Sequence, residues 1–542
     1  MMLDGATSLR TLDLRGNALG SGGGESPDEA TGVPAARLAR LFRRSHSLTE
    51  IDISANRLGA EGSRAACEVL SSCAGLRCLR LADNAMGDAS CLHLIARLQE
   101  GHALTELDVA HNRLTQASAL PLIDLVDASA MLCRLDVRAQ PLGRAVGEGL
   151  SALALRRCDE RGGMTIDGIA LAPLLAGGER VLSYEGMRLG VHDGVMLGAL
   201  LSAASTNAPT PSSCLRTLQL RNNALGEEGA VRLVQSVLPS VEDIDLSDNA
   251  LGADGAIAVI GQLQDTLGGR LGGLRRLALN SNGLGHGGGQ AAVELLRQSS
   301  SLTACELRSN LLPESVGRAI ATLLRDDARL VTLDMRDNPH VGEGTGRALL
   351  AALETNSTLE MVNGLELAKL RGIGLDGGAA ERTDGATRGA RARAAGGGGG
   401  KGGGGHAEGG RAGIASATGG AKGAGGAKRV AKGSAGAAHE ASSFDPPAVG
   451  LAPLELSSMQ MGLVEALIIG KLVAGNRKAS ALLLDSNALG DEAACQLLGL
   501  LSANETLTYL SLRANGISRA SSSAIAAFVE AHTTLRVLVR VP

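Results

Sequence analysis

The chain has 542 residues, a formal net charge of -4 and 20% charged residues, so its overall charge gives no reason to expect a nucleic acid or a membrane surface as partner. Three Phe, two Tyr and no Trp exclude a core built from aromatic side chains. A core of stacked Leu, Val, Ile and Ala is the alternative, and repeat proteins have such a core.

Targeting and redox signals are weak along the whole chain. The first residues lack a basic segment followed by an apolar run, so we expect no signal peptide. The longest apolar stretch, 462–475, is too short for a membrane span and contains Glu465 and Lys471. The nine Cys are scattered without a CxxC pair, and no cluster of ligand residues is apparent. The sequence therefore predicts a cytoplasmic protein with reduced cysteines, no membrane contact, no cofactor and no metal.

A strand pattern near the N-terminus, Leu9, Leu12 and Leu14 followed by Asn17, introduces a motif that recurs to the end of the chain. Several successive copies are spaced by 28 residues, and a fixed period of this length indicates a repeat architecture. The marker Asn stands at Asn17, Asn56, Asn84, Asn112, Asn223, Asn249, Asn282, Asn310, Asn338, Asn487 and Asn515, with Gln140 in its place once.

Elementary physics explains the motif. Two Leu separated by one residue point to the same side of a strand and enter the core. The Asn that follows carries both donors and an acceptor, so its amide can satisfy backbone groups where the chain turns away. Strands stack about 4.8 Å apart whereas helices need about 8–10 Å, so a stack of strand–helix units must curve with its strands inside.

The pattern LxxLxLxxNxLG followed by a helix resembles the leucine-rich repeat, and its length resembles the ribonuclease-inhibitor-like subclass. Clear copies are LTEIDISANRLGAEGSRAACEVL (48–70), LRTLQLRNNALGEEGAVRLVQSVL (215–238) and LTYLSLRANGIS (507–518). The resemblance implies an α/β solenoid, or horseshoe, with parallel strands on the concave face and helices on the convex face. It is specific for fold and unspecific for function.

Three stretches depart from the regular repeat. Residues 20–32 and 206–213 are expected to be loop insertions because they are rich in Gly, Pro and Ser. Between Ala145 and Leu189 the phase blurs, and Met187 occupies the Asn position 47 residues after Gln140. We expect an irregular double repeat there, with a kink or bulge. A weak strand-like copy follows at Leu359.

The composition then changes abruptly. Residues 372–450 are dominated by Gly and Ala and cannot bury a core, so this low-complexity segment is predicted to be a disordered linker. The phase returns at Leu454 and Leu456, with Met459 at the Asn position. The predicted organisation is a repeat array over 1–371, the linker over 372–450 and resumed repeats over 451–542. We expect the resumed repeats to stack on the first array.

Catalytic motifs are missing. The glycine run around Lys401 lacks the Ser or Thr of a phosphate-binding loop and the strand and helix that should flank it. HExxH and GxSxG patterns do not occur. No catalytic residue is predicted, and the protein is not expected to be an enzyme.

The concave strand face is the remaining candidate site. Residues beside the buried Leu point outward, and those two apart share a face. Two interpretations stay open: solvated charge ladders, or a landing surface for a charged protein. The candidate partner-binding residues are Asp13, Arg15, Asp52, Asp108, Asp136, Arg138, Arg221, Asp245, Arg308, Asp334, Arg336, Tyr509 and Arg513.

These features favour a non-enzymatic scaffold that binds a protein partner on the concave face. The resemblance keeps two alternatives open. Activators of the Ran GTPase share this repeat subclass, which implies stimulation of GTP hydrolysis on a small GTPase, although their acidic tail is missing here. Immune receptors of the NLR type carry similar sensor arrays, which would need a nucleotide-binding module.

Overall fold

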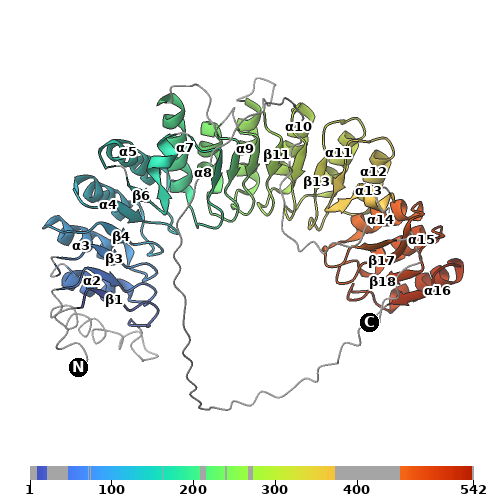
Figure 1. Ribbon diagram of the computed structural model, residues 1–542, viewed down its shortest axis with the longest axis horizontal. Coiled ribbons are helices and arrows are strands. Elements are labelled where there is room, and N and C mark those ends of the chain that lie inside the picture. Colours follow the sequence, from blue (N-terminus) through green and yellow to red (C-terminus); the bar gives the residue numbers. More distant parts are fainter. Residues whose placement is uncertain are drawn as a thin grey trace, which may run out of the picture. The chain divides into compact units, whose positions relative to one another are not determined.

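The computed structural model describes residues 9–20, 47–70, 73, 75–161, 163–176, 178–207, 215–237, 241–265, 273–372 and 452–539. Within these ranges, short strands alternate with helices along the chain (Figure 1). Neighbouring repeats pair their strands in parallel. The predicted α/β solenoid is therefore confirmed. The predicted linker lies outside the described residues except for Gly372.

The strands form three sheets. The first has the order β1-β2-β3-β4-β5-β6-β7, the second runs from β15 to β8 and the third is β16-β17-β18-β19. The strands of the first sheet are β1 (Thr11–Asp13), β2 (Glu50–Asp52), β3 (Cys78–Arg80), β4 (Glu106–Asp108), β5 (Arg134–Asp136), β6 (Thr165–Ile166) and β7 (Ile169–Ala170). Those of the second are β8 (Val181–Ser183), β9 (Thr217–Gln219), β10 (Asp243–Asp245), β11 (Arg276–Ala278), β12 (Ala304–Glu306), β13 (Thr332–Asp334), β14 (Met361–Val362) and β15 (Leu365–Glu366). Those of the third are β16 (Ala452–Glu455), β17 (Ala479–Leu483), β18 (Tyr509–Ser511) and β19 (Val537–Val539).

Helices follow the strands, and each long helix packs against the next long helix along the chain, so that α5 contacts α7 and α12 contacts α14 past the short helices α6 and α13. In the first part of the chain they are α2 (Gly59–Leu70), α3 (Gly87–Gln99), α4 (Gln116–Ala128), α5 (Arg144–Arg161) and α6 (Leu171–Ala176). The middle part has α7 (Val191–Asn207), α8 (Gly226–Val237), α9 (Gly252–Asp265), α10 (Gly285–Gln298), α11 (Glu314–Leu324), α12 (Glu343–Leu353) and α13 (Leu367–Leu370). The last part has α14 (Leu463–Ala474), α15 (Gly490–Leu501), the 3-10 turn η1 (Arg519–Ser521) and α16 (Ser522–Ala531). Helix α7 includes Thr206 and Asn207, so the predicted loop over 206–213 begins later than expected.

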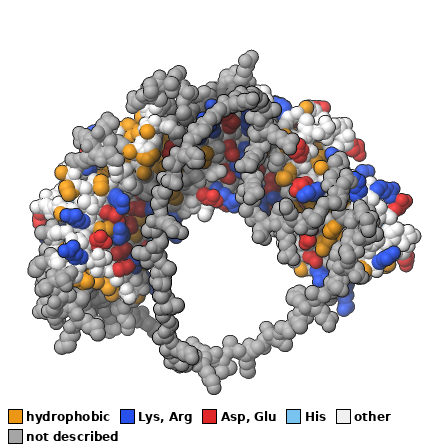
Figure 2. Space-filling model, in the orientation of Figure 1, with side chains coloured by type: hydrophobic (Ala, Val, Ile, Leu, Met, Phe, Trp, Pro, Cys, Tyr) orange, Lys and Arg blue, Asp and Glu red, His pale blue; other side chains and the backbone are white. Residues whose placement is uncertain are grey.

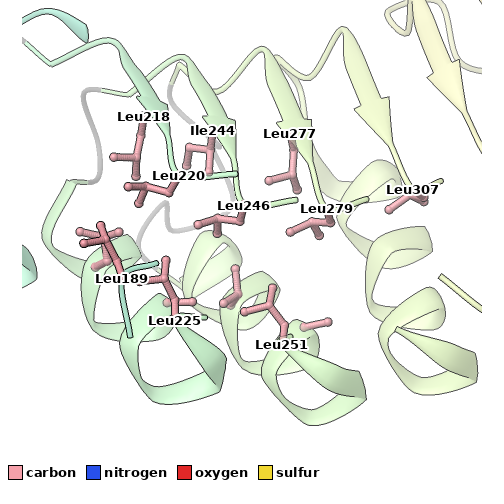
Figure 3. Packing of buried hydrophobic residues seen from close by; sticks show 14 of the residues in the cluster. Leu189, Leu218, Leu220, Leu225, Ile244, Leu246, Leu251, Leu277, Leu279 and Leu307 are labelled. Atoms are coloured by element: carbon pink, nitrogen blue, oxygen red, sulfur yellow. The ribbon is translucent and has the colours of Figure 1, made fainter. Parts of the chain in front are cut away.

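The core is a layer of aliphatic side chains between strands and helices. Leu218, Leu220 and Leu225 of one repeat are completely buried. In Figure 3, Leu218 and Leu220 lie beside Ile244 and Leu246, which come from the next repeat, and Leu225 lies on the helix side of this layer. Each fully buried side chain of this kind stabilises the fold by about 1.5–3 kcal/mol relative to exposure. The same positions filled in every repeat make a core that needs almost no aromatic bulk.

The marker Asn side chains satisfy backbone groups at the turns, as predicted, and together they form a ladder of hydrogen bonds through neighbouring repeats. The Nδ2 of Asn112 donates to the carbonyls of Leu81, Val109 and Ala110 at 2.9–3.1 Å. Its Oδ1 accepts the N–H of Asn84 at 3.0 Å, and so each amide ties its own turn to the preceding repeat. Gln140 continues this chain, because its Oε1 accepts the N–H of Asn112 at 3.1 Å.

The regular order is interrupted twice, and both interruptions have the same construction. The expected double repeat contains an antiparallel hairpin, β6–β7, followed by the short helix α6. The weak copy at Leu359 contains the hairpin β14–β15, followed by α13. We call these the first junction (residues 136–193) and the second junction (residues 334–372 and 452–465). A new sheet starts after each hairpin.

The resumed repeats pack on the first array, as expected. Helix α14 lies between α12 and α15, and this contact explains why it is apolar on most sides. The Nδ2 of Asn476 donates to the carbonyl of Leu370 at 3.0 Å, across the insertion. The described parts of both arrays therefore belong to one folded unit.

Replacing Asn112 by Ala should destabilise the fold by about 3 kcal/mol, because several buried backbone groups lose their partner at once. The matched control is Asn17→Ala, where the amide at the exposed end of the ladder donates to Leu14 and Arg15. The thermal midpoint should fall clearly for the first variant and little for the second. Equal midpoints would contradict a stabilising role of the ladder.

Shortening the insertion should leave the fold intact. In the first junction only residues 177–180 connect α6 to β8, whereas residues 371–451 separate α13 from β16. We expect a chain with residues 373–451 replaced by four Gly or Ser residues to keep its circular dichroism and its thermal midpoint. A thermal midpoint well below that of the native chain would show that the long segment is needed for the resumed repeats to pack on the first array.

Candidate protein-binding face

The register of the strands fixes where the predicted charges meet. Asp13 lies opposite Asp52, and Asp108 lies opposite Asp136, but Arg80 separates these two pairs. In the second sheet, Ala278 and Glu306 stand between the two predicted aspartates, Asp245 and Asp334. The predicted aspartates therefore do not form one continuous column across the strands. The face has short acidic stretches interrupted by other residue types.

Three predicted Asp and Arg pairs form two-pronged contacts within one repeat. The Nη2 of Arg138 lies 2.5 Å from the Oδ2 of Asp136, and its Nε donates to the other oxygen at 3.0 Å. Arg336 and Asp334 repeat this geometry at 2.6 and 3.0 Å. The third pair, Arg15 and Asp13, is the same at 2.7 and 3.1 Å and is the most exposed.

A charge network on the first sheet involves residues outside the predicted set. Glu106 lies between Arg80, whose Nη2 is 2.5 Å from Oε1, and Arg134, whose Nη1 is 3.5 Å from Oε2. Burial alone would raise the pKa of Glu106, but the hydrogen bond from Arg80 lowers it below its ordinary value. Figure 2 shows acidic and basic side chains interspersed where Figure 1 labels β3 and β4.

A second network surrounds Arg276 on β11. Its guanidinium lies 2.8 Å from Asp243, 3.4 Å from Asp245 and 2.8 Å from Glu306. These carboxylates, led by Glu306, more than offset the effect of burial and raise the pKa of Arg276. Of the four residues, only Asp245 belongs to the predicted set. Asp243 and Arg276 stand at the first outward position of the strand, where the period of two would also have placed them on this face.

The remaining predicted residues have separate surroundings. Arg221 contacts Asp248 at 3.3 Å. Arg308 contacts Asp337 at 2.5 Å and also the side chain of Gln460, which belongs to the resumed repeats.

The last two predicted residues lie on the third sheet. Tyr509 is half-buried on β18, beside Val537 of β19. The backbone N–H of Arg513 donates to Asp485 at 2.9 Å. The structure thus distributes the predicted residues over all three sheets rather than gathering them at one point.

The first two strands form a shallow hollow. Its volume is about 140 Å³, and Asp13, Arg15, Glu50, Asp52 and Arg80 line it together with strand residues of β1 and β2. Arg15 reaches Asp52 at 3.4 Å, so three predicted residues meet here. The hollow offers both charge signs to a ligand.

Asp108 lies on β4 and forms no ion pair with a basic side chain of the described residues. It accepts the N–H of Ala110 at 3.0 Å. Burial raises the pKa of Asp108 to about 6; the Ala110 contact opposes this shift, and the negative charge of Asp136 adds to it. A carboxyl group with such a pKa changes charge close to neutral pH.

Comparison with known proteins supports the repeat pattern. A family profile described as "Leucine Rich repeat" matches residues 5–26, 44–65, 212–234 and 237–259. A ribonuclease inhibitor from Sus scrofa is 28% identical over 263 residues, which cover 43% of this chain and 56% of that protein. The chain thus spans little more than half the length of this relative.

Two solved structures also show similarity. One is "Leiomodin-1 Actin-Binding Site 2 (ABS2)", with 17% identity, a TM-score of 0.23 and coverage of 25% of this chain and 76% of that one. The other is a chain of the Rad7 and Elc1 complex in yeast, with 14% identity, a TM-score of 0.25 and coverage of 60% and 72%. Scores this low carry no argument about function.

Among helices of the described residues, none combines the length and apolar character needed to cross a bilayer.

Asp108→Asn should stabilise the protein by about 1–3 kcal/mol at pH 7.5 and have little effect at pH 4. The pKa of Asp108 rises from 3.8 to about 6 on folding, so wild-type stability falls as the pH rises through this window. An uncharged amide removes that loss. Urea unfolding of both proteins at several pH values measures the difference.

Asp13→Asn is the control of opposite sign. The hydrogen bond from Arg15 lowers the pKa of Asp13, so this carboxylate contributes stability that is lost as the pH falls. The control should lose a little stability at pH 7.5 and none at low pH. A gain from Asp108→Asn that does not change with pH would contradict the assignment.

Proposed function

Because the chain is a leucine-rich repeat protein of the ribonuclease-inhibitor-like type, we propose that it is a non-enzymatic scaffold that binds a protein partner on its strand face. The observation that carries the proposal is the pair of mixed charge networks around Glu106 and Arg276. They place ordered charges of both signs on a face built from backbone that the core holds in position.

The exposed fractions of these side chains suit recognition. The side chains of Arg15, Arg134 and Arg221 are 61%, 64% and 54% exposed, although each contacts a carboxylate. Exposed pairs of this kind contribute little to the stability of the fold. Their guanidinium groups can therefore turn to a partner at small cost to stability.

The residue types indicate the character of the partner. Charges of both signs favour a partner whose surface is also mixed, because complementary potentials accelerate encounter and reject like-charged surfaces. Aromatic anchors, which dominate most tight interfaces, are represented on this face by Tyr509. We therefore expect moderate affinity, or a partner that supplies the aromatic side chains.

The ribonuclease inhibitor relative suggests one partner class to include in a test. Its name states that it acts on ribonuclease. The matched part covers 56% of that protein. A ribonuclease is therefore included in the test as one candidate partner. A small GTPase is the second class, because it would separate the scaffold from a GTPase activator.

Reversing two exposed charges of the face should weaken partner binding about tenfold or more, which corresponds to about 1.4 kcal/mol. The variant is Arg134→Glu with Arg221→Glu. The matched control is Arg64→Glu with Arg297→Glu, which makes the same charge change on helices α2 and α10 at side chains 57% and 62% exposed. Proteins captured from cell extract are identified by mass spectrometry, and their affinities are measured with purified components.

A partner that binds both variants as tightly as the native chain would overturn the proposal for this face. The charges would then only keep the face solvated. If a captured small GTPase hydrolysed GTP faster in the presence of the chain, the activator would replace the scaffold as the function.

A further inference from the structure

The two junctions are built alike although their sequences lie far apart. Arg138 donates from Nη1 to the carbonyl of Met187 at 3.2 Å. Arg336 donates in the same way to the carbonyl of Met459 at 3.4 Å. Both methionines stand at the position of the marker Asn. The second junction therefore serves as an internal reference for the first.

The hairpin turns show the same correspondence. Asp167 and Asn363 both adopt a left-handed backbone, with φ of 53° and 51°. The Oδ1 of Asp167 accepts the N–H of Val137 at 2.6 Å, and the Oδ1 of Asn363 accepts the N–H of Met335 at 2.8 Å. In both junctions, one side-chain oxygen of the turn residue thus accepts a backbone N–H from the preceding repeat.

The following helices place an acid at equivalent positions. Asp193 in the first turn of α7 accepts the N–H of Gly190 at 2.8 Å. Glu465 in the first turn of α14 accepts the N–H of Gly462 at 2.8 Å. In the second junction these two side chains are hydrogen-bonded to each other, because the Nδ2 of Asn363 donates to Glu465 at 2.6 Å.

The first junction cannot form the equivalent hydrogen bond between its hairpin and its helix. Asp167 offers a carboxylate where Asn363 offers an N–H donor, so two acids face each other. His192 replaces the apolar Val464, and its Nε2 lies 3.5 Å from Asp167 and 3.2 Å from Asp193. All three side chains are completely buried. Oδ2 of Asp167, Oδ1 of Asp193 and both ring nitrogens of His192 have no hydrogen-bond partner among the described residues.

We propose that Asp167, His192 and Asp193 bind a structural divalent transition-metal ion of the Zn²⁺ type. One ligand atom from each residue lies within 4.8 Å of the others. In a tetrahedral site with bonds of about 2.0–2.1 Å, ligand atoms lie about 3.3–3.4 Å apart, and the two contacts of His192 are close to this edge. The cluster went unseen in the sequence because Asp167 is far from the other two residues along the chain.

The ligand types select the class of ion. One imidazole nitrogen with two carboxylate oxygens suits Zn²⁺ or a similar transition metal. Ca²⁺ requires six to eight oxygen ligands, and Mg²⁺ retains several waters. Neither suits a small, fully buried site with one imidazole. A water molecule can complete the coordination.

Electrostatics also favours a cation. At equivalent positions of the two junctions, one guanidinium, Arg138 or Arg336, accompanies the clustered acids. The first cluster has three carboxylates (Asp136, Asp167 and Asp193), whereas the second has two (Asp334 and Glu465). A bound cation would neutralise this surplus of buried negative charge.

In the second junction, the hydrogen bond between Asn363 and Glu465 connects the hairpin β14–β15 to helix α14. The ion would connect the equivalent elements of the first junction, the hairpin β6–β7 and helix α7. Because the ligands are buried, the ion would be taken up during folding. Its role is structural, and the inference does not depend on the proposed partner.

The test uses the full chain, unfolded with a chelator and refolded with or without Zn²⁺. We expect about one equivalent of Zn²⁺ per chain by elemental analysis and a thermal midpoint raised by several degrees. Refolding with Co²⁺ should give the visible absorption of a tetrahedral site with imidazole ligation. The double variant Asp167→Asn with His192→Val copies the residues of the second junction, so it should fold and lose both the metal and the response of the midpoint.

The control removes the same residue types from an exposed pair. His111 and Asp83 lie 3.0 Å apart, with side chains 56% and 61% exposed. The variant Asp83→Asn with His111→Val should still bind one equivalent. The proposal is overturned if the refolded native chain retains no metal and its midpoint ignores Zn²⁺, or if the Asp167 and His192 double variant binds as much as the native chain.

Discussion

The fold depends on one side-chain amide in each regular repeat. The strands are mostly three residues long, and a strand this short cannot hold its own position. The residues on both sides of the marker Asn are left-handed, as at Ala55 and Arg57 around Asn56, with φ of 55° and 54°. Such a conformation costs about 1–2 kcal/mol for a non-glycine residue. The amide stabilises it, because it donates to the turn and accepts from the preceding repeat.

The strand face inherits its order from this scaffold. Parallel pairing in register places equivalent residues of adjacent repeats next to each other, so a charged side chain can pair with a residue of the neighbouring strand. The contacts of Glu106 with Arg80 and Arg134 arise in this way. The core and the Asn ladder hold the strand face in position without help from these charges. The charged side chains are therefore available to bind a partner.

Much of the fold could be predicted from the sequence because each repeat can be recognised from the spacing of residues within about 28 positions. The buried Leu pairs, the Asn ladder with Gln140 in it and the resumed phase at Leu454 all depend on spacing within one repeat. Cross-strand partners depend on register between repeats of unequal length. The network of Arg276 was therefore missed although each of its residues was visible.

The junctions were harder to predict for a different reason. Their hairpin strands have two residues each, too few to show a period. The meaning of Asp167 appears only when it is compared with Asn363, nearly 200 residues later, and this comparison requires the structure. The sequence located the irregularity and could not assign its chemistry.

The two methionines at marker positions have a consequence for how the molecule unfolds. Met187 and Met459 cannot donate as an amide does, so the hydrogen-bonded ladder runs in three separate segments. In a repeat array, cooperativity passes from each unit to its neighbours. Coupling across the junctions relies on helix packing and on the contacts of Arg138 and Arg336. The second junction adds the hydrogen bonds from Asn363 to Glu465 and from Asn476 to Leu370. An unfolding front that starts at either end would therefore meet its first boundary at a junction, and the boundaries divide the solenoid into three cooperative blocks.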